Sequence, residues 1–525
     1  MRKISKVKLI TILITVFTLT GSQLLFADPK DVINQYIQAV RAEDWEKAES
    51  FWLGEEIEKS NRLGISFGGI EAKYDCASPL IIESDRLLNW AETVKIDYID
   101  GDKVKAIVSL AGDSGDSVHI AYYLAKSGDN WKCCSPMHIY AGDWRILQTR
   151  YFNVHYDDSS LVNEFALHKL DDFIDTLGIR LNIPCERMNH LGINKIDYYL
   201  CDDNQIKLLT GFAGQGMTNF QFDAVITCHL PHSHELVHLM INYALEECPL
   251  FTLPILQEGV ACYLGGRWGK SPEVINYWGN VSLNLGLADL DNLLTKDEFH
   301  NCPGGIDAAY AISSLYVGSL IDKFGIEKFR AFYTLLSGTN EYINSLSRED
   351  IKIQAEKIFN ASWQEIEANL KDFTNQLAYS GIVPGIAPLD QGASRVEETD
   401  DIKMNIWDNG CEYVFQITLK PECQGGAVIL VNNSLSANSP YHSKFFREQF
   451  PDKKYQGEMY GIQITEGEAG LYNYWTNMLL AKYVAGLTTN PNYWDPDKRI
   501  ITFGLDKTLL DKDLGDYRID IMEIK

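Results

Sequence analysis

Two histidines four residues apart, His234 and His238, lie in a mostly apolar segment, and Glu235 directly follows the first of them. On a helix, positions i and i+4 share one face, so both imidazoles can bind the same cation. Glu235 lies about 100° further round the helix, where it can contact a water molecule on that cation without binding the cation itself. Pro231 and Ser233 are typical of a helix start. The pattern therefore predicts a helix that carries a metal-binding pair and an adjacent base.

The alternative is that these are core or surface histidines without a metal. A second segment downstream favours the metal. Residues 256–263, which include Glu258, follow Pro254 and are predicted to form another helix. Nineteen residues separate His238 from Glu258, which is enough chain to leave the first helix, turn and bring a carboxylate back to the cation. Three protein ligands leave one coordination position open, as in catalytic rather than structural zinc sites.

These residues together resemble the gluzincin, or thermolysin-like, zinc metallopeptidases of the broad peptidase-MA-like group. The matching features are His234-Glu235-x-x-His238, the nineteen-residue gap and Glu258-Gly259-x-Ala261. A further segment is similar to the helix that carries a catalytic tyrosine in the aminopeptidase branch; it comprises Tyr310, Ser313, Ser314, Leu320, Phe324-Gly325 and Phe329. The resemblance covers roughly residues 148–385.

The resemblance implies that His234, His238 and Glu258 bind Zn²⁺, that Glu235 is the general base and that Tyr310 stabilises the oxyanion. In such a site zinc polarises the scissile carbonyl and acidifies its water, a carboxylate transfers the proton to the leaving amine, and a phenol donates a hydrogen bond to the developing oxyanion. The alternative for Tyr310 is a core aromatic on an amphipathic helix. The implied activity is hydrolysis of peptide bonds in a peptide or protein substrate.

Two positions depart from the family pattern. Cys262 stands four residues after Glu258, where thermolysin-type enzymes carry an aspartate that supports a ligand histidine. Residues 216–219, Gly-Met-Thr-Asn, are similar to the aminopeptidase segment that holds the free amine of the substrate, but they lack its glutamate. We therefore predict an endopeptidase. The alternatives are an aminopeptidase and a non-catalytic cell-envelope binding or scaffold protein that retains the fold.

Other histidines lie near the motif or in a later loop. His229 and His232 are expected to be loop or supporting residues rather than ligands, and His300 is a residue that can enter the cleft. Residues 223–227 form a short β-branched strand before the motif helix. That strand is expected either to offer its backbone to an extended substrate or to be an ordinary edge strand.

The elements around these residues predict an α+β protein with a thermolysin-like peptidase domain between two accessory domains. Residues 28–145 contain helical spacing from Lys30 to Trp52 and then four strand-like runs, resembling the cone-shaped α+β fold of nuclear-transport-factor-like domains. Residues 146–385 form the peptidase domain, which closes with a helix over residues 362–378 and a Gly/Pro-rich linker over 380–388. Residues 390–525 contain short strand-like runs typical of a β-sandwich. Aromatic residues there are either core residues or a platform for a glycan or protein ligand: Tyr472, Tyr474, Trp475, Tyr493 and Trp494.

Residues 1–27 have the basic start, apolar middle and small final residue of a secretory signal peptide, with an uncleaved anchor as the alternative. No later stretch has the length and apolarity of a membrane span. The formal net charge is −25, which disfavours nucleic acid and anionic lipid as partners. We therefore expect a secreted, periplasmic or other extracytoplasmic protein. Export permits disulfides, for which Cys133, Cys134, Cys201, Cys411 and Cys423 are candidates among eleven cysteines.

Overall fold

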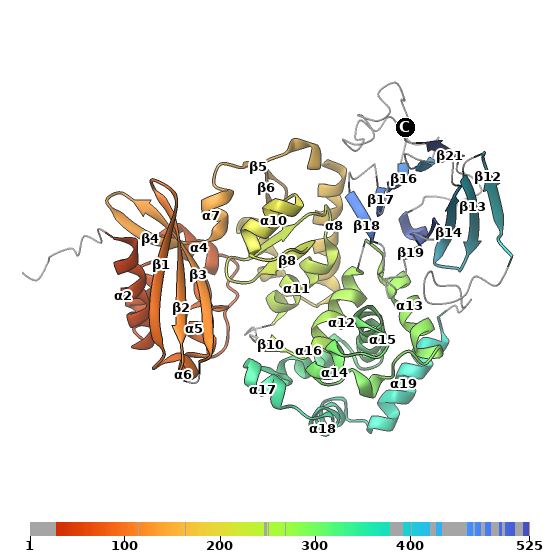
Figure 1. The fold of residues 1–525 in the computed structure, drawn as a ribbon. Helices are drawn as coiled ribbons and strands as arrows, with labels where there is room; N and C mark the ends of the chain where they lie inside the picture. Colours follow the sequence, from red (N-terminus) through yellow and green to blue (C-terminus); the bar gives the residue numbers. More distant parts are fainter. Residues whose placement is uncertain are drawn as a thin grey trace, which may run out of the picture. The chain divides into compact units, whose positions relative to one another are not determined.

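The protein is described by a computed structural model with a mixed α+β architecture (Figure 1). The structure describes residues 28–377 except 114, 163, 246–248, 250 and 268. It also describes residues 392–400, 402–420, 427–432, 459–465, 468–473, 478–484, 493–495, 499–509 and 518–523. The predicted signal peptide, the predicted linker, Cys423, Tyr474 and Trp475 lie outside the described residues. No helix within the described ranges is long and apolar enough to cross a membrane.

The chain divides into two compact units, and each is described by itself. The smaller unit comprises the chain up to Glu58 and residues Ala77–Gly142, and the larger unit comprises Lys59–Cys76 and Asp143–Lys525. Thus an eighteen-residue segment, 59–76, which lies within the predicted N-terminal domain, belongs by its contacts to the larger unit.

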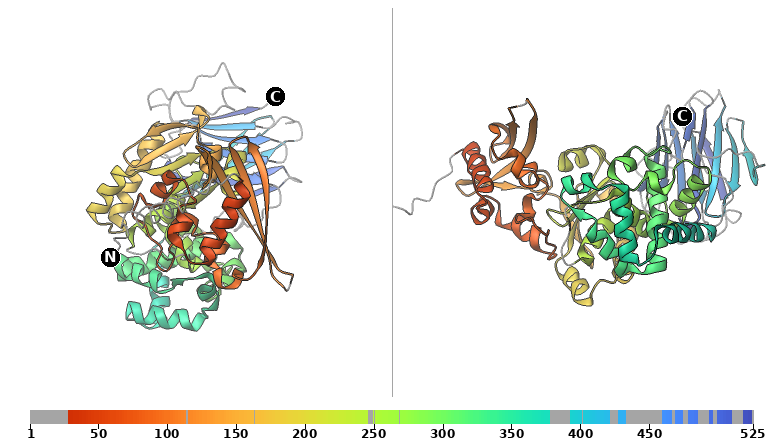
Figure 2. Two further views of the ribbon diagram at one scale, coloured as in Figure 1. Left: turned by 90° about the vertical axis from the view of Figure 1, so that its left-hand side faces the viewer. Right: turned by 90° about the horizontal axis from the view of Figure 1, so that it is seen from below.

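In the smaller unit, helix α2 packs against a four-stranded antiparallel meander with the order β1-β2-β3-β4 (Figures 1 and 2). Apolar residues of α2 recur at helical spacing and are buried, while β2 alternates between buried and half-buried positions. The predicted helical spacing and the four predicted strands are confirmed. The elements of this unit are α2 Pro29–Arg41, α3 Trp45–Glu49, α5 Pro79–Ile82, α6 Ser84–Leu87, β1 Ala91–Asp100, β2 Lys103–Ala111, β3 Ser117–Ser127, β4 Asn130–Cys134 and α7 Pro136–Tyr140. Helix α4, Gly54–Asn61, begins in this unit and ends in the segment 59–76.

The first part of the larger unit is a five-stranded mixed sheet with the order β5-β6-β7-β9-β8, in which β6, β7 and β9 are parallel and β8 runs antiparallel at one edge. The predicted strand over residues 223–227 corresponds to β9, which lies between β7 and β8 in the interior of the sheet. Both interpretations of this strand assumed that it lies at an edge, and that assumption is wrong. The edge strand is instead β8, which contains residues 216–219. The elements are β5 Arg145–Gln148, β6 Phe152–Tyr156, α8 Glu164–Arg180, α9 Cys185–Ile193, β7 Ile196–Leu200, α10 Asp203–Thr210, β8 Gly216–Asn219 and β9 Ala224–Thr227.

Helices make up most of the next part, and their apolar faces share one large core with the sheet. Helix α12 packs against both α11 and α15, and α13 also packs against α15 (Figure 1). The elements are α11 Ser233–Ala244, β10 Phe251–Thr252, α12 Pro254–Gly265, α13 Pro272–Asn284, α14 Lys296–His300, α15 Ile306–Phe324, α16 Ile326–Leu335, β11 Ser337–Gly338, α17 Asn340–Ser345, α18 Arg348–Phe359 and α19 Trp363–Asn375.

The C-terminal part consists of two five-stranded sheets, with the orders β12-β13-β14-β20-β19 and β18-β17-β16-β15-β21. All their strand pairs are antiparallel, and the short strand-like runs predicted in residues 390–525 are confirmed as strands within the described ranges. Tyr472 lies in β17, and Tyr493 and Trp494 lie in β19. The strands are β12 Arg395–Glu398, β13 Ile402–Asp408, β14 Glu412–Leu419, β15 Ala427–Asn432, β16 Met459–Thr465, β17 Glu468–Asn473, β18 Met478–Val484, β19 Tyr493–Asp495, β20 Ile500–Asp506 and β21 Arg518–Glu523.

Two ion pairs, one of them fully buried, hold segment 59–76 in the larger unit. The Lys73 ammonium lies 2.7 Å from a carboxylate oxygen of Asp223, directly before β9, and both side chains are buried. Arg62 lies 2.8 Å from Asp197 on β7. Apolar residues of the segment, among them Leu63 and Phe67, join the same core as α11 and α12. The segment is therefore an integral part of the larger unit.

We expect Asp223→Asn to lower the free energy of unfolding of the larger unit by about 3–5 kcal/mol, because it leaves the Lys73 ammonium buried without its counter-charge. Asparagine tolerates the positive φ of 49° at this position, so the loss reports the charge rather than the backbone. Urea unfolding followed by tryptophan fluorescence measures it. The control is Glu398→Gln, which removes an exposed ion pair with Lys420 and is expected to cost less than about 1 kcal/mol. Equal effects of the two substitutions would contradict the prediction.

Candidate metal centre

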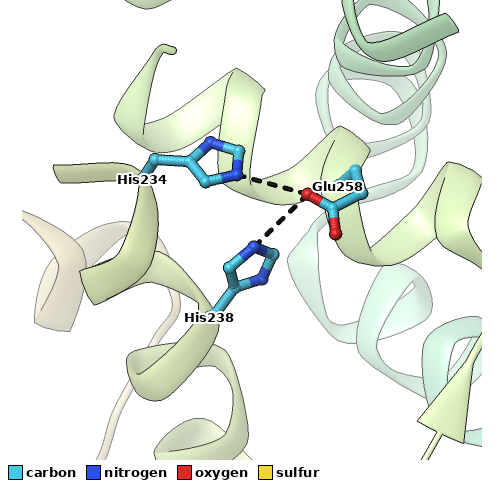
Figure 3. A group of neighbouring side chains, drawn as sticks. All are labelled: His234, His238 and Glu258. Carbon is cyan, nitrogen blue, oxygen red and sulfur yellow. Dashed lines mark hydrogen bonds and ion pairs between the residues drawn. The ribbon is translucent and has the colours of Figure 1, made fainter. Parts of the chain in front are cut away.

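Three side chains from two helices converge in the larger unit: His234 and His238 on α11, and Glu258 on α12 (Figure 3). Oε2 of Glu258 lies 3.2 Å from Nε2 of His234 and 3.4 Å from Nε2 of His238. Both histidines are buried, with 4% and 6% of the residue surface exposed. The structure therefore brings together the three residues that the sequence predicts as ligands.

The donor set fits a zinc ion. Two ligand atoms that each lie about 2.0–2.1 Å from a tetrahedral ion are about 3.3 Å apart, close to the two distances between Glu258 and the histidines. Nδ1 of His234 donates a hydrogen bond to the carbonyl of Gly266 at 2.9 Å, so Nε2 directs its lone pair at the other two ligand atoms. Imidazole nitrogens and a carboxylate oxygen are common zinc ligands.

The electrostatics of the cluster follow from this convergence. Burial lowers the pKa of His234 below its ordinary value. Burial alone would raise the pKa of Glu258, but the neighbouring imidazoles, His238 foremost, outweigh it and hold that pKa well below the ordinary value. For His238, burial alone would lower the pKa, but the Glu258 carboxylate outweighs it and raises the pKa. The half-buried Glu258 thus keeps its negative charge and can present it to a cation that the imidazoles bind.

Glu235 lies beside the ligand cluster but is not a member of it. Its carboxylate accepts a hydrogen bond of 2.8 Å from the hydroxyl of Thr218, on the edge strand β8. Gly216 allows β8 to approach α11 this closely, because a Cβ at this position would lie 2.2 Å from the ring of His232 and 3.1 Å from Cγ of Glu235. The edge strand therefore holds the predicted base in place.

A cavity of about 320 Å³ opens onto the cluster. Its wall includes the three candidate ligands and Glu235, and also contains Gly216, Met217, Thr218, Phe220, Gln257, Arg267 and Tyr310. A second cavity of about 180 Å³ shares Gln257, Glu258 and Tyr310 with the first and is further lined by Phe251, Thr252, Pro254, Lys296, Phe299, His300, Asn340 and Ile343. The candidate ligands therefore face a space into which a substrate can bind.

Tyr310 lies on α15, and its ring centroid is 6.3 Å from that of His234. It is half-buried and lines both cavities, so its position differs from that of a simple core aromatic. Burial raises the pKa of its phenol above the ordinary value, which keeps the phenol a hydrogen-bond donor.

Arg267 is a site residue that the sequence reasoning missed. Its Cζ lies 3.4 Å from the centroid of the Tyr310 ring, and its Nη1 lies 3.3 Å from Nε2 of His234. A guanidinium over an aromatic face is held by cation–π attraction. Its position in the sequence, nine residues after Glu258, belongs to none of the motifs described above, and only the fold brings its charge to the cavity.

The remaining candidate residues lie outside the ligand cluster. Nδ1 of His232 lies 2.7 Å from Oγ1 of Thr227, and Nε2 of His229 lies 3.2 Å from Oε1 of Gln215, so both are loop residues as expected. His300 lines the second cavity. Cys262 is fully buried among apolar residues of α13, and burial raises the pKa of its thiol. The carbonyl of Gly266, and not the side chain at 262, supports His234.

Among the nine cysteines within the described part of the chain, which include the disulfide candidates Cys133, Cys134, Cys201 and Cys411, no disulfide is formed. Comparisons with protein-family models, with curated proteins and with solved structures give no match. The chemistry of the site therefore rests on its own geometry.

Replacing Glu258 by alanine is expected to weaken zinc binding by at least about a hundredfold, because it removes one of three ligands and the only anionic one. Isothermal titration of the metal-free protein with zinc measures the affinity. The matched control is Gln257→Ala on the same helix, which changes the wall of the same cavity but no ligand. Unchanged affinity in Glu258→Ala would show that this carboxylate does not bind the metal.

Proposed function

We propose that the chain is a zinc-dependent metallopeptidase that cleaves peptide bonds within a peptide or protein substrate. The observation that carries the proposal is the position of Glu235. Its carboxylate lies in the wall of the cavity, next to three residues suited to zinc and outside that set, and a hydroxyl from an edge strand holds it there. A purely structural metal site needs neither an open cavity nor a spare carboxylate.

His234, His238 and Glu258 would hold the zinc ion, which when bound supplies Lewis-acid chemistry that polarises the scissile carbonyl and acidifies the attacking water. Glu235 accepts the proton of that water and then delivers it to the leaving amine. Thr218 keeps the carboxylate of Glu235 oriented. The phenol of Tyr310 and the guanidinium of Arg267, which stack on each other, donate hydrogen bonds to the oxyanion as charge develops on it.

The edge strand β8 supports a peptide as the substrate. Residues Gly216, Met217 and Thr218 line the cavity, and β8 pairs with β9 along only one of its sides. An extended peptide can add to such an edge through main-chain hydrogen bonds. The second cavity, which shares Glu258 and Tyr310 with the first, is positioned to accept a side chain next to the scissile bond.

Internal cleavage is favoured over aminopeptidase activity by the charges of the two cavities. Within the described part of the chain, the carboxylates that line them are Glu235 and Glu258, and both already have roles in the proposed site. No further acidic side chain of these linings is left to bind the free amine of a substrate. A non-catalytic binding or scaffold protein is the alternative from another class.

The proposal also assigns a fold to each part of the chain. The sheet and helices around α11 and α12 would form a thermolysin-like peptidase domain, the smaller unit a nuclear-transport-factor-like accessory domain, and the two C-terminal antiparallel sheets a β-sandwich. Secretion, or export to the periplasm or another extracytoplasmic space, follows from the signal-like N-terminal segment.

Glu235→Gln is expected to lower kcat/KM by about 10²–10⁴-fold, because it removes the group that transfers the proton, while one zinc ion per chain stays bound. Cleavage of an unfolded protein and of peptides with blocked termini, followed by mass spectrometry, measures the activity and separates internal cleavage from removal of terminal residues. The control is Glu273→Gln at an exposed position of α13. Bound zinc without cleavage in the unmodified protein would favour the scaffold alternative.

Tyr310→Phe is expected to lower kcat by about 10²–10³-fold with little change in KM, because the phenol acts on charge that develops only in the transition state. Steady-state kinetics on a defined blocked peptide separate kcat from KM. Tyr316→Phe is the matched control, since Tyr316 lies on the same helix but is fully buried in the core. If both variants retain full kcat, the phenol of Tyr310 has no part in the reaction.

A further inference from the structure

The loop that joins α12 to α13 begins at the metal centre. The carbonyl of Gly266 accepts the hydrogen bond from Nδ1 of His234, and the next residue, Arg267, lies over Tyr310 and beside Nε2 of His234. The first two residues of the loop therefore orient one ligand and place a positive charge in the cavity.

The same loop ends in contact with a C-terminal sheet. Lys270 is 4% exposed, and its ammonium donates to Glu412 on β14 at 2.6 Å and to the carbonyl of Gly504 on β20. The other carboxylate oxygen of Glu412, itself fully buried, accepts a hydrogen bond from the Trp278 indole on α13 at 2.9 Å. The backbone N–H of Ser271 donates to Asp506 at 2.6 Å.

A tight turn couples the two ends of the loop. The N–H of Arg267 donates to the carbonyl of Lys270 at 3.1 Å, and the N–H of Lys270 donates back to the carbonyl of Arg267 at 2.8 Å. Gly266 has a φ of +74°, and a Cβ there would lie 1.9 Å from the carbonyl oxygen of Lys270. Because these backbone groups are in direct contact, we expect a displacement of Lys270 to displace the Gly266 carbonyl that orients His234.

We propose that Lys270 and Glu412 are positioning residues of the metal centre, so that the sheet containing β14 and β20 is part of the catalytic machinery. The inference rests on the proposed function, because it concerns the same ligands. A buried ion pair contributes little net stability compared with apolar residues of similar volume, but it demands one geometry. Groups that hold a ligand histidine change metal affinity by about 10–100-fold when they are altered.

The test compares Glu412→Gln with Asp223→Asn in the full-length protein. Both substitutions change a buried carboxylate that pairs with a lysine into an amide, but only Glu412 is connected to the loop at the metal centre. Competition with a chromophoric chelator is expected to show zinc bound about tenfold more weakly by Glu412→Gln, and within about twofold of the unmodified protein by Asp223→Asn. The d–d absorption spectrum of the cobalt-substituted protein is expected to change only in Glu412→Gln.

A second measurement needs no metal. In the metal-free protein labelled with ¹⁵N-histidine, the Nδ1–H resonance of His234 reports its hydrogen bond to Gly266, and it is expected to shift in Glu412→Gln and not in Asp223→Asn. A folded Glu412→Gln with unchanged zinc affinity, cobalt spectrum and His234 resonance would overturn the inference. Absence of zinc binding by the unmodified protein would instead overturn the proposed function, while the resonance still decides the role of Glu412.

Ser271→Pro provides an independent variant if Glu412→Gln does not fold. Ser271 has a φ of −67°, which proline adopts, and the substitution removes the N–H that donates to Asp506. Zinc affinity is expected to fall by about threefold or more, together with a shift of the His234 resonance. The same affinity and resonance as in the unmodified protein would count against the coupling between the loop and the sheet.

Discussion

The carboxylate of Glu258, in contact with two buried imidazoles, is the interaction on which the site depends. A carboxylate removed from water is costly unless positive charge or hydrogen bonds compensate it. His238 compensates part of that charge in the metal-free chain, and in the proposed function a divalent cation would compensate it more fully. In the proposed function, the same negative charge would favour the binding of a divalent cation at this cluster.

This constraint explains why rigid helices carry the ligands. His234 and His238 are one turn apart on α11, and Glu258 comes from α12, which packs between α11 and α15. Backbone spacing on α11 fixes the two imidazoles, and helix packing fixes the carboxylate. The less regular groups, Thr218 and Arg267, come from an edge strand and a loop, where the chain can turn a polar side chain toward the cavity.

The local part of this arrangement was predictable from the sequence, because the spacing of two histidines on one helix and most strands depend on neighbours along the chain. One non-local contact, that of Glu258 with the two histidines, was also predictable, because its spacing from His238 resembles that of a known family. Three features depend on pairings that no local pattern records: β8 rather than β9 at the sheet edge, residues 59–76 in the larger unit, and Arg267 over Tyr310. The hydrogen bond that orients His234 was not predictable, because its acceptor is the backbone carbonyl of Gly266 and every residue has such a carbonyl.

The contact between Lys270 and Glu412 also bears on what counts as an accessory domain. Domain boundaries are predicted from a sequence where its composition changes and linkers occur. The residues that hold a functional site in position can extend beyond such a boundary. Lysine and glutamate are rarely both fully buried, and apolar residues of similar volume would cost less desolvation. A buried charged pair is therefore expected where the direction of its hydrogen bonds matters more than its contribution to the stability of the fold. The Lys270 ammonium donates hydrogen bonds to a carboxylate and to a carbonyl, and these bonds have defined directions. They can therefore fix the direction of the chain as it leaves the candidate metal centre. An apolar contact of equal area has no such directionality.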